Sequence, residues 1–352
     1  MLKKIALVLL AVLTLSVGFV AVKFIIPMYT ALDVVGPGSA PRDLALQDDS
    51  RVEAPFGNAH SALVEGRPFS ENMAAGGAKL YWGELHLHTT ESIDASIMGN
   101  KLSIEDAYRF AKGEPLVGAG GETMQLSRPL DFVAITDHAE GFGTRTHCSG
   151  PDLSLVNRAT CWLMGLDNPA LFTIFIDGTR GTAAPGDPSK PAGVYQPEFR
   201  QPLALGAFPT CRLGVGAAQR CYQNTYNDWA HYVRLADAYY EPGKLTTLIA
   251  YEFSPQLPDQ GKHHRNIIFR SNTVPDRAIS SFDVPNAIEL WKGLEANCDK
   301  ANGCDFLTIP HNSNKAWGLT YSRYTWDGQQ YSEDDWRLRQ KREPLTEIFQ
   351  IK

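Results

Sequence analysis

Residues 132–138 read FVAITDH, an apolar run that ends abruptly in the polar residues Asp137 and His138. The run follows Pro129 and has the length of a buried strand, which we predict over residues 130–136. In a parallel α/β barrel the C-terminal ends of the strands face the active site, so these two side chains occupy a position typical of functional groups. The alternative is an aspartate that caps a helix beside a surface histidine.

Similar apolar runs alternate with amphipathic segments along the chain. We predict strands over residues 80–87, 245–253, 266–269, 306–309 and 345–351, and helices over residues 103–112, 226–240 and 285–296. Ser103, with Asp106 three residues later, is a candidate N-cap, and Gly113 follows the end of that helix. Strands that alternate with helices indicate parallel βα units and an α/β fold. Residues 141–225 and 313–343 break the pattern, and we interpret them as loop insertions.

A His-x-His pair lies in the first predicted strand, where residues 84–89 read ELHLHT. Side chains alternate across a strand, so Glu84, His86 and His88 point to one face. Two imidazoles on one face can converge on one metal ion, and imidazole is a common ligand of Zn, Mn and Fe. Two ordinary histidines on a half-exposed strand are the alternative explanation.

Polar residues also lie at the ends of three other apolar strands. Glu252 stands near the end of residues 248–253, and a buried carboxylate there needs a partner, either a metal ion or an arginine. His264 precedes the strand over 266–269, and His311 follows the strand over 306–309. The recurrence of such residues at strand ends predicts a metal centre.

The order of these motifs resembles the metal-binding series of the PHP (polymerase and histidinol phosphatase) superfamily. The motifs are His86-x-His88-Thr89, Thr136-Asp137-His138, Glu252, His264 and Ile309-Pro310-His311. Three stretches resemble more closely an exported bacterial branch known only as a domain of unknown function, DUF3604. They are YWGELHLHT (81–89), EDAYRFAKGE (105–114) and HRNIIFR (264–270). The resemblance covers roughly residues 80–352.

This resemblance implies a distorted seven-stranded β/α barrel that holds two or three divalent metal ions. The first two ions are expected to share a carboxylate, with these ligands: His86, His88 and Glu252 for the first, and Glu252, His264 and His311 for the second. His138 is expected to hold a third ion. Asp94 stands where the superfamily has a further histidine, and a carboxylate there favours harder ions such as Mn²⁺.

Two further residues receive expected roles. Arg265 is a candidate phosphate clamp, because a guanidinium group can bind phosphate through two hydrogen bonds; a salt bridge at the barrel rim is an equal alternative. Asp137 is expected to orient a histidine rather than to bind metal. The late Asp-x-His of the superfamily is absent, since no histidine follows His311. We therefore expect a C-terminally truncated chain whose barrel is incomplete and ends at the strand over 345–351.

The expected chemistry is metal-dependent hydrolysis of a small-molecule ester, with a phosphoester as the first candidate and Zn, Mn or Fe as the metal. Hydrolysis of a sulfate ester or an amide is an alternative, and so is a metal-stabilised binding protein without catalysis, because a fold does not fix a function. A net charge of −6 without a Lys/Arg block argues against a nucleic-acid partner.

The N-terminus predicts export. A basic MLKK head precedes residues 5–22, which carry no charge, as in a secretory signal or an uncleaved inner-membrane anchor. No Ala-x-Ala cleavage site is evident, which favours the anchor. We assign residues 1–28 to this segment, 29–78 to an irregular lead-in and 79–352 to the metal-binding domain, which we place in the periplasm.

Six cysteines follow the N-terminal segment, and an even number in an exported chain predicts disulfides. Fifteen connectivities are possible. Pairing of sequence neighbours is the simplest: Cys148–Cys161, Cys211–Cys221 and Cys298–Cys304. The alternative, a thiolate zinc site, needs tighter spacing such as Cys-x-x-Cys.

We predict that a reporter fused after residue 60 is active only when it is a periplasmic type such as alkaline phosphatase, because residues 1–28 direct the chain across the inner membrane. Parallel fusions to periplasmic and cytoplasmic reporters measure this. Activity of the cytoplasmic reporter alone would reverse the assignment.

Overall fold

The computed structural model describes residues 80–348, except residues 98, 119, 149, 151–152, 165–181, 184–196, 199–210, 212–215, 256–261, 317 and 326–327. The segments predicted at 1–28 and 29–78 lie outside the described residues. The chain divides into residues 1–82 and 83–352, and all elements below belong to the second unit. Among the described helices, none is long and apolar enough to cross a bilayer.

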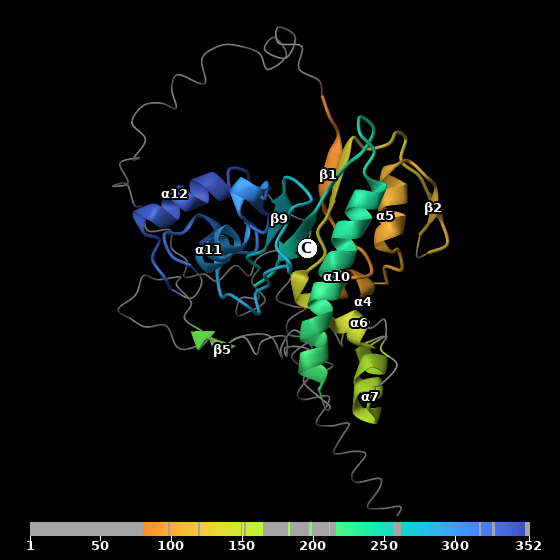
Figure 1. Cartoon of the computed structure of the whole chain (residues 1–352), viewed down its shortest axis with the longest axis horizontal. Coiled ribbons are helices and arrows are strands. Elements are labelled where there is room, and N and C mark those ends of the chain that lie inside the picture. The colour runs from red at the N-terminus through yellow and green to blue at the C-terminus, as the bar shows by residue number, and fades with distance from the viewer. Residues whose placement is uncertain are drawn as a thin grey trace, which may run out of the picture. The chain divides into compact units, whose positions relative to one another are not determined.

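Three strands form a parallel sheet in the order β1-β4-β7. They are β1 (Gly83–Leu87), β4 (Phe132–Ile135) and β7 (Thr246–Leu248). Parallel neighbours require a crossover connection, which is usually helical. Along the chain, α5 (Ile104–Ala111) comes between β1 and β4, and α10 (Ala217–Tyr239) comes between β4 and β7; the two helices lie beside each other (Figure 1). The predicted parallel βα units are confirmed for this sheet.

The next three strands form an antiparallel sheet in the order β10-β9-β8. They are β8 (Ala250–Phe253), β9 (Arg265–Phe269) and β10 (Phe306–Pro310). The prediction of parallel strands is wrong here. Residues 254–264 are too few for a helical crossover, so the chain turns directly back from β8 into β9. The strand predicted over 245–253 is interrupted at Ile249. The residues before Ile249 form β7 of the first sheet, and the residues after it form β8 of the second.

The fold is α/β, and the described strands do not close into a barrel. The contacts that link the sheets include a backbone bridge between His138 and Glu252 and a hydrogen bond in which the Nδ2 of Asn266 donates to the carbonyl of Leu85 at 3.0 Å. The strand predicted over 345–351 is wrong for its described part, since residues 345–348 are not in a strand.

A proline explains why no ladder forms at that place. Glu347 N donates to the carbonyl of Pro310 at 2.9 Å. Pro310 has no N–H to return a hydrogen bond, so the pairing cannot continue as a ladder.

The predicted helices are present with altered ends. The Ser103–Asp106 capping box begins α5, and Gly113, which has a left-handed backbone, follows it. Helix α10 begins earlier than predicted, and α11 (Ala287–Asn297) takes its N-cap from Asn286. The insertions and remaining connections hold α4 (Ile93–Ile97), β2 (Leu116–Val117), β3 (Thr123–Met124), η2 (Ala139–Gly141), α6 (Thr144–Cys148), α7 (Leu155–Met164), β5 (Thr182–Ala183), β6 (Pro197–Glu198), η4 (Lys300–Asn302), η5 (Leu319–Tyr321) and α12 (Glu333–Arg342).

All six cysteines form disulfides, and each pairs with its sequence neighbour as predicted. The bridges are Cys148–Cys161, Cys211–Cys221 and Cys298–Cys304. The thiolate zinc site is thereby excluded, and the bridges are consistent with an exported protein.

Alternate side chains of the strands enter two different apolar clusters. The outer cluster packs strand residues such as Val133, Tyr251 and Ile267 against helix residues that include Trp229 and Trp291. The inner cluster is small and receives residues from all the strands of both sheets: Ala134, Ala250, Ile268 and Ile309, with Leu85, Leu248 and Leu307 against them. Because side chains alternate along a strand, the inner face is fixed by the outer core.

We predict that Leu294→Ala lowers the free energy of unfolding by about 2–5 kcal/mol, because the fully buried side chain on α11 leaves a cavity in the outer core. Denaturant titration measures the change. Lys292→Ala, at a half-exposed position of the same helix, is the control and should change stability by less than about 1 kcal/mol. Equal effects of the two substitutions would contradict the described packing.

Candidate metal centre

Four candidate ligands lie on the inner face of the strands, two or four residues beyond the small apolar cluster, whereas in β1 a register shift between Glu84 and Leu87 breaks the alternation beside His86. Ala250 of that cluster lies two residues before Glu252, and Ile309 lies two residues before His311. Residues separated by two positions share a face of a strand. Ala134 and His138 are four residues apart, and so are Ile268 and His264; this even spacing also places each pair on one face. The apolar cluster therefore forms a floor, and the polar side chains converge above it.

Glu252 is the centre of this convergence, and its side chain is completely buried. Its Oε2 lies 2.9 Å from the Nε2 of His88 and 3.2 Å from the Nε2 of His86. Its Oε1 faces three other imidazoles: the Nδ1 of His264 at 2.5 Å, the Nδ1 of His138 at 3.3 Å and the Nε2 of His311 at 3.3 Å. Each carboxylate oxygen thus has its own set of nitrogen donors.

Asp94 forms a second centre at the side of the first. Its Oδ2 lies 3.0 Å from the Nε2 of His138, and its Oδ1 lies 3.5 Å from the Nδ1 of His88. Asp94 is in α4, the element that follows β1, and His88 is the first residue after β1. The short helix therefore returns the carboxylate to the histidines of β1 and β4.

The structure brings together all seven residues that the sequence predicted as ligands. Their donor atoms fall into four overlapping groups, each within 4.8 Å: His86, His88 and Glu252; His88, Asp94 and His138; His138, Glu252 and His264; and His86, His311 and Glu347. Imidazole nitrogens and carboxylate oxygens are the donors that suit Zn, Mn and Fe in proteins. The residues present therefore fit a centre of two or three divalent ions.

Glu347 belongs to the cluster and was not predicted from the sequence. Its Oε2 lies 3.1 Å from the Nδ1 of His86, although the two residues are 261 positions apart. No local pattern marks it, because it stands in an apolar stretch that favours a strand. Only its proximity to Pro310, the residue before His311, places it at the site.

Two serines also contact the candidate ligands. Ser92 Oγ lies 2.7 Å from the Nδ1 of His88. Ser254 Oγ donates to the Oε1 of Glu252 at 3.0 Å and also contacts the Nδ1 of His138. These hydroxyls fix the orientation of the imidazoles, which is the role of outer residues around metal ligands. Their spacing from the ligands carries no distinctive sequence signal.

The cluster concentrates negative charge that needs a compensating positive charge. Burial raises the pKa of Glu252, but His138, His311 and the other imidazoles outweigh it and hold that pKa well below its ordinary value. Burial likewise raises the pKa of Asp94, which His138 and His88 lower well below the usual range. Burial lowers the pKa of His88, yet hydrogen bonds to Asp94 and Glu252 raise it to about 10. The ionised carboxylates attract a proton or a metal cation into the site.

Asp137 supports the site without contacting its histidines. It accepts hydrogen bonds from the backbone N–H and the hydroxyl of Thr89, both at 2.6 Å, and from the hydroxyl of Tyr232 at 2.5 Å. Burial raises the pKa of Asp137. The carboxylate therefore holds the residue that follows His88, so its influence on that histidine passes through the backbone.

Arg265 points away from the cluster. Its side chain is buried on the outer face of β9, where the Nε lies 3.4 Å from Glu343 and the guanidinium group lies over the ring of Trp291. The position matches the salt-bridge alternative for this residue. The described contacts give no support to a role as a phosphate clamp.

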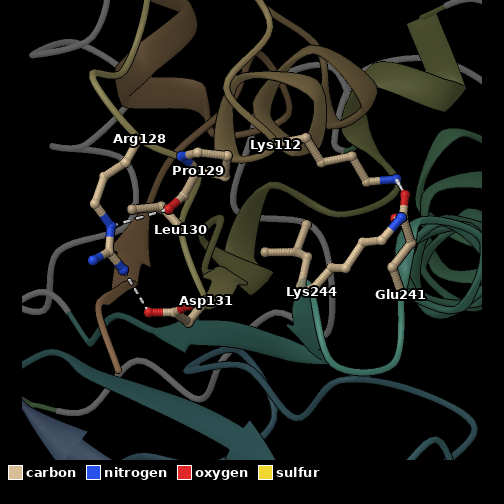
Figure 2. A pocket seen from close by; sticks show the side chains of 8 residues that line it. Lys112, Arg128, Pro129, Leu130, Asp131, Glu241 and Lys244 are labelled. Atoms are coloured by element: carbon tan, nitrogen blue, oxygen red, sulfur yellow. Dashed lines mark hydrogen bonds and ion pairs between the residues drawn. The ribbon is translucent and has the colours of Figure 1, made fainter. Parts of the chain in front are cut away.

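A surface pocket of about 700 Å³ lies at the opposite end of the parallel strands (Figure 2). Its walls include residues that precede β4 and β7, whereas His88 and His138 follow β1 and β4. Arg128 pairs with Asp131 at 2.6 Å, and Glu241 pairs with Lys112 at 2.5 Å and Lys244 at 3.3 Å. The charges of this pocket are paired with one another, so we assign it no part in the centre.

A family model described as "Protein of unknown function (DUF3604)" matches residues 75–352. The chain belongs to the DUF3604 family. The match confirms that part of the resemblance, and the residues of the candidate centre all lie inside it. No curated protein and no solved structure matches the chain significantly. The DUF3604 description assigns no activity, so the geometry of the centre must supply the argument for function.

We predict that Glu252→Gln abolishes high-affinity binding of Zn²⁺ or Mn²⁺, because the substitution removes the charge that both sets of histidines surround. Elemental analysis after dialysis measures bound metal, and circular dichroism verifies folding. Glu289→Gln, at a half-exposed position on α11, should retain the metal content of the natural sequence. Unchanged metal content in Glu252→Gln would show that the centre is not built on this carboxylate.

Proposed function

We propose that this DUF3604 chain is a metal-dependent hydrolase, and that its substrate is a small phosphoester. The observation that carries the proposal is the position of Glu252 between two sets of histidines, one on each carboxylate oxygen. A carboxylate in that position can bridge two metal ions. Paired ions held in this way are typical of enzymes that displace a group at phosphorus.

Bound metal ions supply a water of lowered pKa and stabilise negative charge that develops on the ester oxygens. The residues of the chain position those ions. His86, His88 and Glu252 would hold one, and Glu252, His264 and His311 would hold another. His138 and Asp94 would hold a third, with Ser254 keeping the ring of His138 oriented through its Nδ1.

Charge favours an anionic substrate. The inner face of the described centre carries two buried or half-buried carboxylates, Glu252 and Asp94, with Glu347 at its edge. Two or three divalent ions exceed this negative charge, so the loaded site has a net positive charge that attracts a phosphate group. Arg265 takes no part in this attraction, because it lies on the outer face.

The order of the ligand motifs supports a relation to the PHP superfamily, which we include in the proposal. A barrel-like curvature of the strands is also supported, because all strands of both sheets contribute to one inner apolar cluster. The hydrogen bond from Asn266 to Leu85 also holds β9 close to β1, as a barrel-like curvature requires. We further propose that the chain acts in the periplasm, held at the inner membrane by residues 1–28, and has no nucleic-acid partner.

We predict that the full chain loaded with Zn²⁺, Mn²⁺ or Fe²⁺ hydrolyses 4-nitrophenyl phosphate or bis(4-nitrophenyl) phosphate. The double substitution His86→Ala/His88→Ala should lower kcat/KM by more than about 100-fold, because it removes donors from the first ion. A chelator should abolish the activity, and added metal should restore it. Release of 4-nitrophenol measures the rate.

Matched assays with 4-nitrophenyl sulfate and a 4-nitroanilide separate the rival hydrolases. Activity on only one of these two substrates would replace the phosphoester with a sulfate ester or an amide. A metal-loaded chain that is inactive on all of them would favour a metal-stabilised binding protein.

A further inference from the structure

His86 lies between two carboxylates, and this position forces a choice between its two nitrogens. The Nε2 lies 3.2 Å from the Oε2 of Glu252, and the Nδ1 lies 3.1 Å from the Oε2 of Glu347. A neutral imidazole has one N–H and one lone pair. Only one nitrogen can therefore bind a metal ion, and the other must donate a hydrogen bond.

The surroundings decide which nitrogen faces the metal. The Nε2 of His88 lies 2.9 Å from the same Oε2 of Glu252, so the Nε2 atoms of both histidines converge on one oxygen. His88 places its other nitrogen, Nδ1, beside the hydroxyl of Ser92 at 2.7 Å. His86 repeats this arrangement, with Glu347 in the place of the serine.

We propose that Glu347 is a positioning residue of the metal centre. Its carboxylate accepts the Nδ1–H of His86, which fixes the tautomer that presents the Nε2 lone pair beside Glu252. The inference rests on the proposed metal centre and adds a residue whose role no family description assigns. A carboxylate that receives the second N–H of a ligand histidine also increases the electron density on the metal-binding nitrogen.

The backbone around His311 holds Glu347 in place. Glu347 N and the hydroxyl of Thr346 both donate to the carbonyl of Pro310, at 2.9 and 3.2 Å. Ser313 Oγ donates to the carbonyl of Ile348 at 2.5 Å. The ring of His311 lies 4.0 Å from that of His86. The segment over 346–348 is therefore attached to both sides of His311, and it couples that histidine to His86.

A direct ligand role for Glu347 is the rival explanation. It requires the lone pair of His86 to be on Nδ1, with Nε2–H donating to Glu252. That tautomer would remove a nitrogen donor from the convergence on Glu252 Oε2. The two explanations therefore predict opposite tautomers in the protein.

The first test is the tautomer itself, measured in the Zn²⁺-loaded chain, because without an ion both carboxylates can accept a proton from His86. Nitrogen-15 NMR of the full chain labelled at histidine reports which nitrogen carries the proton, because a metal-bound neutral imidazole keeps a single N–H. The signal of His86 is identified by its loss in His86→Ala. We expect Nδ1–H in the natural sequence, with Nε2 bound to Zn²⁺. A His86 with Nε2–H in the natural sequence would overturn the proposal.

The second test is Zn²⁺ affinity, measured by competition with a chromogenic chelator. Glu347→Ala should weaken binding by about 10- to 100-fold without changing the number of ions bound. Glu347→Gln should retain most of the affinity, because its amide oxygen accepts the same N–H. Glu333→Ala, at an exposed carboxylate of α12, is the control and should leave the affinity unchanged.

The outcomes distinguish failure of the positioning role of Glu347 from failure of the proposed function. Loss of one bound ion in both Glu347 variants would make Glu347 a ligand and overturn the positioning role. Unchanged affinity in Glu347→Ala would also overturn it while leaving the proposed hydrolase intact. Absence of Zn²⁺ binding in the natural sequence would overturn the proposed function and the positioning role together.

Discussion

The buried carboxylate of Glu252 is the constraint on which the rest of the structure depends. An ionised carboxylate without exposure to water is strongly destabilising unless charges and hydrogen bonds compensate it. Here five imidazoles and the hydroxyl of Ser254 surround the two oxygens. The imidazoles come from both sheets, so the sheets must hold their strand ends together at one place. The transfer of the chain at Ile249, between β7 and β8, brings Glu252 to that place.

The outer core makes this convergence possible. Helices α10 and α11 bury one face of the strands with large side chains such as Trp229 and Trp291. The opposite face carries the smaller inner cluster, which includes Ala134 and Ala250, and the polar side chains beyond it. The division of each strand into an outer and an inner face thus positions the ligands, whereas contacts such as that of Asp137 with Thr89 adjust individual residues.

Much of the centre could be predicted from the sequence, because period-2 alternation and strand ends are local properties. They placed His86, His88, Glu252 and their partners correctly near one another, and the capping box at Ser103 and the neighbouring cysteine pairs were equally local. The strand directions beyond Ile249 were not, since β9 and β10 pair antiparallel although a connection that contains α11 joins them. The direction of Arg265 depends on which face of β9 meets Trp291. Glu347 reaches His86 only through a tertiary contact with Pro310, for which the sequence has no signal.

The central proposal is that two metal ions would share Glu252, and anomalous diffraction tests it most directly. Crystals of the chain grown with Zn²⁺ or Mn²⁺ should be measured on both sides of the absorption edge of the metal. The account predicts two peaks that flank Glu252, one on the Oε2 side with the Nε2 atoms of His86 and His88, and one on the Oε1 side with His264 and His311. Each should lie within about 2.0–2.2 Å of its donor atoms. Peaks that lie elsewhere, or no peak beside Glu252, would contradict the account.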